Sequence, residues 1–306
     1  MTSYLVTVLI LVSIAALTGL ALNMQWGTAG LVNFGVVGFV ALGAYAQALL
    51  APWLGWAGAM AAGAALCAAV SVLLALLSIR LDENYLAIVT IGFGEVVRIV
   101  LLNETWLTGG AVGISGIERP FEGLAAYDES GLVLLAFAAA LLLGVFLLLE
   151  LLLRSPFGRA LRALRDDPVV ASALGKHVLV LRIKAFAVGG AVMGLAGALH
   201  ACFLRYIDPS QFTPIITAYA FMAVIAGGRG SNLGLLVGAG SIMLLLEATR
   251  FLKDMIMVID GVQLAALRLA LVGLGIVLLL IYRPQGFMAE PRVRAGDLLP
   301  DSPKDA

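Results

Sequence analysis

The sequence predicts an all-α, polytopic helical membrane protein, and three observations lead to this fold class. Of the 306 residues, 62% are apolar and 12% are charged, against roughly 45–50% and about 25% in ordinary soluble proteins. No charged residue precedes Arg80, and 79 uncharged residues cannot form the solvated surface of a soluble domain. Most charges then lie in short clusters between apolar stretches of about 20 residues, the length that a helix needs to cross a bilayer.

The apolar stretches predict eight to nine transmembrane helices, because the seventh stretch is short. They cover residues 4–22, 29–50, 57–79, 85–103, 131–153, 184–204, 215–228, 233–252 and 263–283. The region 23–56 is rich in Gly and is a candidate for a broken or re-entrant segment. The last residues, 284–306, are rich in Pro and charge and predict a disordered tail.

The distribution of basic residues predicts how the chain is oriented. Lys and Arg gather in the loop 154–183 and after residue 283, and loops rich in these residues stay in the cytoplasm. We therefore expect 154–183 and the C-terminus to be cytoplasmic, and the polar, Gly-rich loop 104–130 to be external.

The loop 154–183 carries the signals of two short helices. Pro156 suits the first turn of a helix, and Arg residues recur every third position from 159 to 165. Asp167 can cap the amides of Val169 or Val170 in a second helix, which Gly175 would end. Such a pair can dock a motor subunit, whereas a loop that only orients the protein needs charge alone.

Sequence patterns of enzymes are missing. The chain has no Gly-x-x-x-x-Gly-Lys-[Ser/Thr] phosphate loop and no cluster of His or Cys with metal-ligand spacing. The net charge of zero gives no indication of a nucleic-acid partner. We expect no catalytic residue, no metal and no cofactor bound by this chain.

Polar side chains inside the apolar stretches are candidates for a translocation path. Glu95 and Arg98 lie one turn apart near the midplane, where they either line the path or form an ion pair that locks helices. Asn33, Thr90 and Asn103 either contact substrate or bond across helices. Two more sets are expected to be structural: an ion pair of Glu247 with Arg250 or Arg268, and close helix packing at Gly190/Gly194 and Gly234/Gly238.

Several motifs together resemble the permease subunits of branched-chain amino acid ABC importers, of the LivM type. They are NMQWGTAGLVNFG at 23–35, NYLAIVTIGFGEVVR at 84–98, TGGAVGI at 108–114, GRALRALRDDP at 158–168 and RPQG at 283–286. Ala111 departs from the family pattern, where Pro or Asn is common. The resemblance extends over nearly the whole chain, so residues 1–283 are expected to be one transmembrane permease domain.

The resemblance implies a multi-pass subunit of the bacterial inner membrane that is not itself an enzyme. Its implied partners are a second, homologous permease subunit, two ABC ATPase subunits that use ATP, an external solute-binding protein and membrane lipid. The substrate is expected to be a branched-chain or related amino acid, with amides and urea left open. The alternative is an ion-coupled secondary transporter of small polar solutes, with Glu95 as its titrating carboxylate.

In the family, the inner loop is the element that contacts an ATPase. This implied coupling role is carried over to the matching positions of the loop, which are Gly158, Arg159, Arg162, Arg165, Asp166, Pro168 and Gly175.

Overall fold

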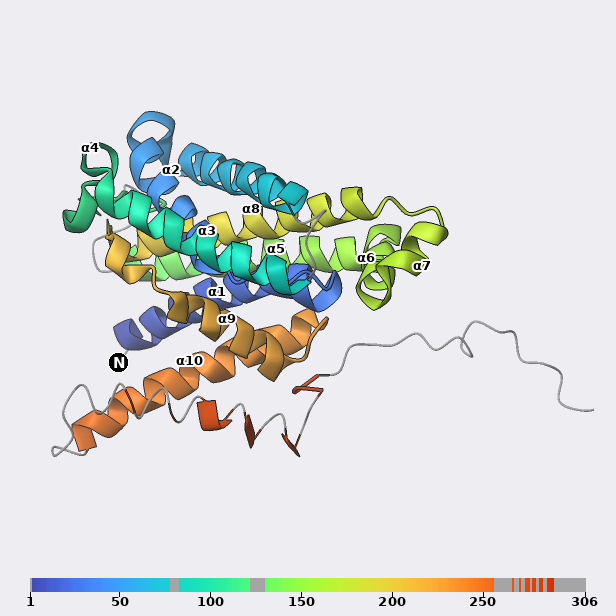
Figure 1. Cartoon of the computed structure of the whole chain (residues 1–306). Helices are drawn as coiled ribbons and strands as arrows, with labels where there is room; N and C mark the ends of the chain where they lie inside the picture. Colours follow the sequence, from blue (N-terminus) through green and yellow to red (C-terminus); the bar gives the residue numbers. More distant parts are fainter. Residues whose placement is uncertain are drawn as a thin grey trace, which may run out of the picture.

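Long apolar helices dominate the computed structural model (Figure 1). The structure describes residues 2–77, 83–121 and 130–255, and beyond these 266, 270, 273–275, 277–278, 281–282 and 285–288. The longer helices are α1 (Thr2–Leu22), α2 (Val36–Leu77), α3 (Glu83–Asn103), α5 (Ser130–Arg154), α8 (Val178–Leu204), α9 (Pro214–Gly227) and α10 (Asn232–Met255). The all-α class predicted from the sequence is confirmed.

Within the described residues, six helical stretches are long and apolar enough to cross a membrane: 4–28, 36–77, 85–103, 131–154, 178–204 and 209–227. Helix α2 contains two of the predicted stretches. Its path breaks at Gly55, where φ is 70°, three residues after Pro52. A Cβ atom added to Gly63 would lie 3.2 Å from the Cβ atom of Ala46, so the two arms of α2 lie side by side. The predicted stretch 263–283 lies mostly outside the described residues.

Glycine allows α2 and α8 to approach closely. A Cβ atom on Gly197 of α8 would overlap the carbonyl oxygen of Val40, and one on Gly194 would lie 3.0 Å from the Cβ atom of Cys67. In α9 and α10, Gly227 and Gly234 meet in the same way. The glycines that the sequence assigns to helix packing therefore have that role.

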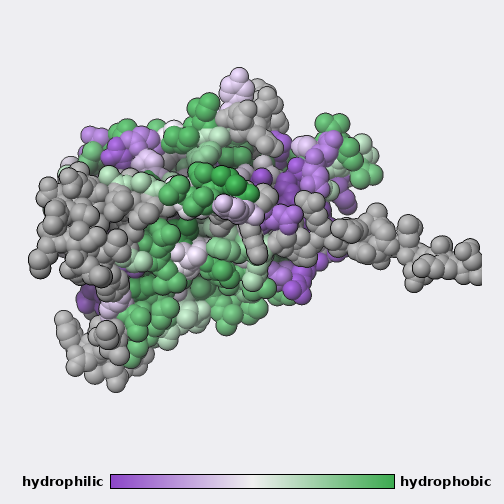
Figure 2. All heavy atoms as spheres, turned by 90° about the horizontal axis from the view of Figure 1, so that it is seen from below, coloured by the Kyte–Doolittle hydropathy of each residue, from purple (hydrophilic) through white to green (hydrophobic). Residues whose placement is uncertain are grey.

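The surface is apolar between two polar ends (Figure 2). Leu73, Ile88 and Leu151 are exposed although they are large and aliphatic, while Phe39 and Phe186 are fully buried in the core. This distribution is what a lipid-solvated bundle requires, because acyl chains solvate aliphatic side chains as well as a protein core does. The chain is a multi-pass membrane protein.

Short elements close one end of the bundle. They are α4 (Thr105–Thr108), η3 (Gly110–Val112), the strands β1 (Ile114–Ser115) and β2 (Tyr206–Ile207), and η5 (Pro209–Gln211). The strands pair antiparallel, with Ile114 opposite Ile207. This end contains most of the loop expected to be external, whose residues 122–129 lie outside the described residues.

At the opposite end lie α6 (Pro156–Asp166) and α7 (Pro168–Ala173) (Figure 1). The described residues of the predicted tail, 285–288, are ordered against α9, whereas the sequence predicts disorder from 284 onward. The amide of Phe287 donates to the carbonyl oxygen of Ala226 at 2.8 Å, and that of Met288 donates to Gly227 at 3.1 Å. These backbone hydrogen bonds attach 285–288 to the end of α9. Arg80 and residues 289–306 lie outside the described residues.

Candidate functional site

A break in the helical path lies at the centre of the candidate site. After α1 the chain forms a π-helix, η1 (Asn23–Thr28), and α2 begins only at Val36. Gly30 has a φ of 75°, and the amide of Leu31 donates to the carbonyl oxygen of Gln25 at 2.8 Å. The predicted broken segment is thus confirmed and lies at 23–35. Non-helical backbone at membrane depth needs polar partners inside the protein.

Buried amide side chains supply these partners. Gln25 Nε2 donates to the carbonyl oxygen of Phe186 in α8 at 3.1 Å, and Asn33 Nδ2 donates to Gln25 Oε1 at 2.8 Å. Asn33 Oδ1 accepts from the amide of Gly35 at 2.8 Å. Gln25 and Asn33 are fully buried. Asn33, expected near the path, therefore supports the broken segment and ties it to α8.

Two threonines attach the end of this segment to further helices. The amide of Phe34 donates to Thr90 Oγ1 of α3 at 3.0 Å, and that of Val37 donates to Thr217 Oγ1 of α9 at 3.2 Å. The structure thus brings the predicted residues Asn33 and Thr90 to two successive backbone amides, since Thr90 accepts from Phe34 and Asn33 accepts from Gly35. Asn103 does not join them, since it is exposed at the end of α3 and donates to the carbonyl oxygen of Ile99 at 2.8 Å.

A second polar chain joins the start of η1 to α5 and α10. Asn23 Nδ2 donates to Asn232 Oδ1 at 3.1 Å, and Asn232 Nδ2 donates to Glu150 Oε2 at 3.1 Å. The amide of Gly230 donates to Asn23 Oδ1 at 2.9 Å, and Arg154 Nε lies 2.9 Å from Glu150 Oε1. Sequence reasoning missed this chain, although Glu150 is a rare charge within an apolar stretch.

Helix α6 packs directly beneath η1. Ser155 caps its first turn by accepting from the amide of Phe157, and Pro156 follows the cap. Arg165 Nη1 donates to the carbonyl oxygen of Gly27 at 2.5 Å. A Cβ atom on Gly30 would lie 3.0 Å from Cγ of the same arginine. The side chain of Arg165 is therefore held between α6 and the broken segment.

The other predicted arginines of α6 differ in their surroundings. Arg162 Nη2 donates to the carbonyl oxygen of Leu153 at 2.7 Å, whereas Arg159 is exposed and reaches the carbonyl oxygen of Arg154 at 3.5 Å. A Cβ atom on Gly158 would overlap the carbonyl of Leu153, so glycine permits the tight corner between α5 and α6. The expected basic face thus points partly toward the protein's own backbone.

Helix α7 presents an apolar side to solvent. Asp167 caps it by accepting from the amides of Val169 at 2.7 Å and Val170 at 3.1 Å, as the sequence predicts. Pro168 occupies the first turn, and Gly175 follows the helix with a φ of 74°. Asp166 is exposed and lies 3.5 Å from Arg165. The apolar side chains that remain exposed are Val169, Val170 and Leu174.

The charged residues of α3 and α10 are not part of this arrangement. Glu95 and Arg98 pair with each other on α3. Glu247 accepts from the hydroxyl of Tyr4 at 2.8 Å, a partner that sequence reasoning missed. The side chain of Arg250 and all of Arg268 lie outside the described residues, so the pairing of Glu247 with either stays a prediction.

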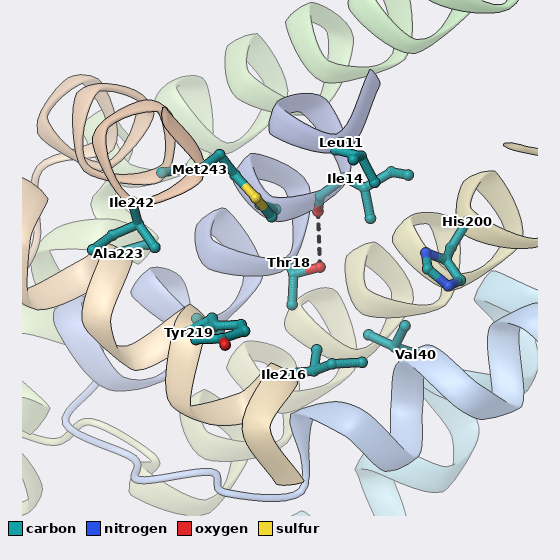
Figure 3. Close-up of a pocket in the computed structure, with 13 residues that line it drawn as sticks. Leu11, Ile14, Thr18, Val40, His200, Ile216, Tyr219, Ala223, Ile242 and Met243 are labelled. Carbon is teal, nitrogen blue, oxygen red and sulfur yellow. Dashed lines mark hydrogen bonds between the residues drawn. The ribbon is translucent and has the colours of Figure 1, made fainter. Parts of the chain in front are cut away.

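An apolar cavity of about 120 Å³ lies between α1, α9 and α10 (Figure 3). Leu11, Ile216 and Met243 are among its aliphatic walls. Thr18 donates its hydroxyl proton to the carbonyl oxygen of Ile14 at 2.9 Å, and His200 Nε2 is buried without a hydrogen-bond partner in the described part of the chain. The cavity suits an apolar group. The described residues contain no group of three His, Cys, Asp or Glu that could hold a metal.

At the end of the molecule opposite α6 and α7, the turn at Asp208 contains a carboxyl group with a shifted pKa. Asp208 accepts from the amide of Ser210 at 2.7 Å and from Gln211 Nε2 at 2.9 Å. Partial burial raises the pKa of the Asp208 carboxyl, but hydrogen bonds donated by Ser210 and Gln211 outweigh it and hold the pKa below its ordinary value. This turn caps η5 and carries the chain into α9.

Comparison with known proteins identifies relatives over nearly the full length. Residues 4–282 match the family described as branched-chain amino acid transport system / permease component. The chain is 37% identical to the high-affinity branched-chain amino acid transport system permease protein LivM of Escherichia coli (strain K12), across 92% of this chain and 70% of the relative. It is 27% identical to the probable branched-chain amino acid transport permease protein LivM of Methanocaldococcus jannaschii, across 90% of each.

A more distant relative is the high-affinity branched-chain amino acid transport system permease protein LivH of Salmonella typhimurium. It is 28% identical across 69% of this chain and 61% of the relative. The family match covers all the membrane-spanning helices described above. The chain therefore belongs to the family of permease components of branched-chain amino acid transport systems.

Proposed function

We propose that this chain is the translocation subunit of an ATP-driven importer of branched-chain or related amino acids. An external binding protein would deliver the substrate, and separate ABC ATPase subunits would hydrolyse ATP. This chain would bind no cofactor and catalyse no reaction. Its family membership and its lack of a phosphate loop support this division of labour.

One observation carries the proposal: the helix pair α6–α7 exposes apolar side chains on one side and bonds to the broken segment on the other. Val169, Val170 and Leu174 of α7 are exposed at a polar end of the molecule, where an apolar patch is typical of a protein contact. The other side contacts the broken segment, because Arg165 of α6 donates to the carbonyl oxygen of Gly27 in η1. A partner that moves α7 would therefore also move the broken segment.

The broken segment can distribute this motion. Gln25 connects it to α8 and Thr90 connects it to α3, while Thr217 of α9 binds the first turn of α2, which follows the segment directly. If the ATP-bound and ADP-bound ATPase bind the helix pair α6–α7 with different affinity, these links shift the bundle between an outward-open and an inward-open form. The helix bundle is then the part that has two stable forms, and the difference in ATPase affinity for α7 decides which form is favoured.

The location and partners follow from the same proposal. The chain would lie in the bacterial inner membrane with its α6–α7 end and its C-terminus in the cytoplasm. A second, homologous permease subunit would complete the path, two ABC ATPase subunits would dock at the cytoplasmic end, and lipid would surround the bundle. The exposed loop residues Arg159, Asp166, Pro168 and Gly175 would contact the ATPase, while Gly158, which is buried, and Arg162, which is half-buried, would hold the shape of that surface.

A matched pair of valines tests the proposal. Val169 in α7 and Val112 in η3 are 75% and 79% exposed, at opposite ends of the molecule. In a co-expressed complex, Val169→Asp should lower the amount of co-purified ATPase about fivefold or more, because a charge would face an apolar contact. Val112→Asp makes the same chemical change and should leave ATPase recovery unchanged. Equal recovery with both variants would contradict the docking role of α7.

The alternative of an ion-coupled secondary transporter has less support. It requires a midplane carboxylate free to exchange a proton or sodium ion, yet Glu95 accepts hydrogen bonds from Arg98. Leucine uptake by this chain alone in vesicles with an imposed ion gradient, without ATPase subunits, would favour it over the importer.

A further inference from the structure

Glu95 and Arg98 place an ion pair near the middle of a membrane-spanning helix. Arg98 Nε lies 3.1 Å from each carboxylate oxygen of Glu95, and Arg98 Nη2 also bonds to Oε1. Glu95 lies ten residues after Tyr85, where the apolar stretch 85–103 begins. At about 1.5 Å per residue, this places it about 15 Å along the helix. Both charges are therefore close to the bilayer midplane.

The pair does not join α3 to another helix in the part of the chain that the structure describes. Leu86, Thr90 and Val97 form the buried side of α3, and Ile91, Val96 and Ile99 are exposed around the charges. The side chains of Glu95 and Arg98 are 41% and 31% exposed. Because both partners lie on one helix and face outward, a role in locking two helices of this chain has no support from this geometry.

Contact with lipid is a poor explanation for this exposure. Charged side chains at the bilayer centre are costly, and those that occur face a protein interior or a water-filled cavity. Even a paired charge loses its hydration without full compensation. This side of α3 must therefore be covered by protein or lie along an aqueous path.

Space is available beside the pair. Gly92 lies one turn before Glu95, and a Cβ atom added to it would have no neighbouring atom within 4 Å. A small residue at this position leaves the carboxylate accessible from one side. Ile91, Val96 and Ile99 add an aliphatic border to the two charges.

We propose that Glu95 and Arg98 form a subsite for the charged head of an amino acid in transit. The α-ammonium group would donate to the Glu95 carboxylate, and the Arg98 guanidinium would donate to the α-carboxylate, the fork geometry that arginine favours. The branched aliphatic side chain would lie against the border of Ile91, Val96 and Ile99. This inference rests on the proposed function and specifies the substrate chemistry that α3 would recognise.

The pair also accounts for charges on the path of an apolar solute. A branched-chain amino acid is apolar only in its side chain, and its zwitterionic head loses hydration when it leaves water. An opposed carboxylate and guanidinium can replace that hydration without adding net charge to the site. The apolar cavity between α1, α9 and α10 offers no such pair.

The test uses the complete importer in proteoliposomes, with radiolabelled leucine, ATP and the loaded binding protein. The Glu95→Gln/Arg98→Gln double variant removes both charges together and leaves no uncompensated charge; glutamine keeps the shape of the side chain at 95 and gives a shorter polar side chain at 98. We expect its leucine uptake to fall about tenfold or more, because charge-assisted hydrogen bonds to the substrate are lost. Arg98→Lys keeps the charge but loses the fork, so its uptake should lie between those of the double variant and the wild type.

Two controls accompany the uptake measurement. Lys184→Gln removes an exposed charge of α8 that takes no part in the candidate site and should keep uptake within about twofold of the wild type. Recovery of the second permease subunit and ATP hydrolysis stimulated by the binding protein should be retained in the double variant, which shows that the complex is folded.

The outcomes separate this inference from the proposed function. Uptake by the double variant of more than about half the wild-type rate would overturn the subsite, because the charges would then be dispensable. Loss of the second permease subunit from the double variant would also overturn it and make this side of α3 a subunit contact. Absence of uptake by the wild-type complex would overturn the proposed function itself and this inference with it.

Discussion

Arg165 donates a hydrogen bond from Nη1 to the carbonyl oxygen of Gly27 at 2.5 Å, across 138 positions of sequence. The carbonyl belongs to a π-helix, whose backbone leaves acceptors that an ordinary helix would use internally. Gly30, which lies in the loop after the π-helix, packs against the aliphatic part of the Arg165 side chain. The bond thus connects the helix pair α6–α7 with the break in the helical path between α1 and α2.

Removal of this bond should uncouple transport from ATP hydrolysis. In Arg165→Ala, α6 would keep its cap and its contacts through Leu161 and Leu164, which are buried, so the ATPase should still co-purify. Leucine uptake per ATP hydrolysed should fall about fivefold or more, since a charge-assisted hydrogen bond transmits the motion. The ratio of uptake to phosphate release in proteoliposomes measures this effect.

Arg165→Lys provides the graded control for that experiment. Lysine can donate one bond to Gly27 but lacks the planar fork, so partial coupling is expected. Full coupling in Arg165→Ala would contradict the transmission role of Arg165. Loss of ATPase binding would show instead that Arg165 acts by holding the docking surface.

Stability measurements should rank the members of the chain from Asn23 to Arg154. Asn23→Ala removes the donor to Asn232 and the acceptor of the Gly230 amide, and Asn23 is fully buried. We expect a loss of about 1–3 kcal/mol in the free energy of unfolding, the cost of unsatisfied buried groups.

Arg154→Ala serves as the comparison for Asn23→Ala, because it removes an exposed partner of Glu150. It should cost less than about 1 kcal/mol. Thermal unfolding of both variants in the same detergent tests the order. A larger effect of Arg154→Ala would mean that the ion pair, and not the amide chain, holds this end of the bundle together.

The helix pair at 156–175 could be predicted because its signals are local. Pro156, Asp167 and Gly175 each act within a few residues, and the Asp167 cap forms as expected. The partners of the pair could not be predicted. Gly27 and Leu153 offer backbone carbonyls, which no side-chain pattern marks, and which of them an arginine meets depends on how α1, α5 and α6 pack.

The broken segment was predictable only in outline. Gly-rich sequence indicates interrupted helix near 23–56, but it does not indicate a π-helix at Asn23–Thr28 or the amide link from Gln25 to α8. Asn33 was predicted to contact substrate or to bond across helices, but Asn23 and Gln25 were not, although they too are amides within a stretch without charge and such residues need polar partners. Similarly, apolar composition cannot separate the exposed side of α3 from its buried side, because both are largely aliphatic.

Two glycine-to-alanine substitutions should distinguish a position where two helices pack closely from a position where a larger side chain fits. Gly197→Ala in α8 would place a Cβ atom against the carbonyl of Val40, on the backbone of α2. Because neither backbone can yield easily, we expect a loss of about 2 kcal/mol or more, as for overpacked sites. Thermal unfolding in detergent measures this loss.

Gly144→Ala in α5 is the matched control, since a Cβ atom there has no neighbour within 4 Å. It should leave stability unchanged or raise it by up to about 1 kcal/mol, because alanine favours helix. A destabilising Gly144→Ala together with a neutral Gly197→Ala would contradict the close approach of α2 and α8.

The turn at Asp208 should make part of the stability depend on pH. Hydrogen bonds from Ser210 and Gln211 outweigh burial and keep the pKa of the folded Asp208 below its unfolded value, which is about 3.9. A carboxyl with a depressed folded pKa stabilises the native state above the unfolded pKa, and this stabilisation is lost as pH falls through the folded pKa. Asp208→Asn should therefore melt at a lower temperature than the wild type at pH 7, and the gap should narrow once the pH falls below the unfolded pKa and toward the lower folded pKa, where the wild-type carboxyl becomes protonated too. Ser210→Ala removes one of the donors and should show a smaller gap with the same trend. Melting curves in detergent from pH 7 to pH 3 decide the point: a gap that stays constant across this range would mean that Asp208 acts through its shape and not through its charge.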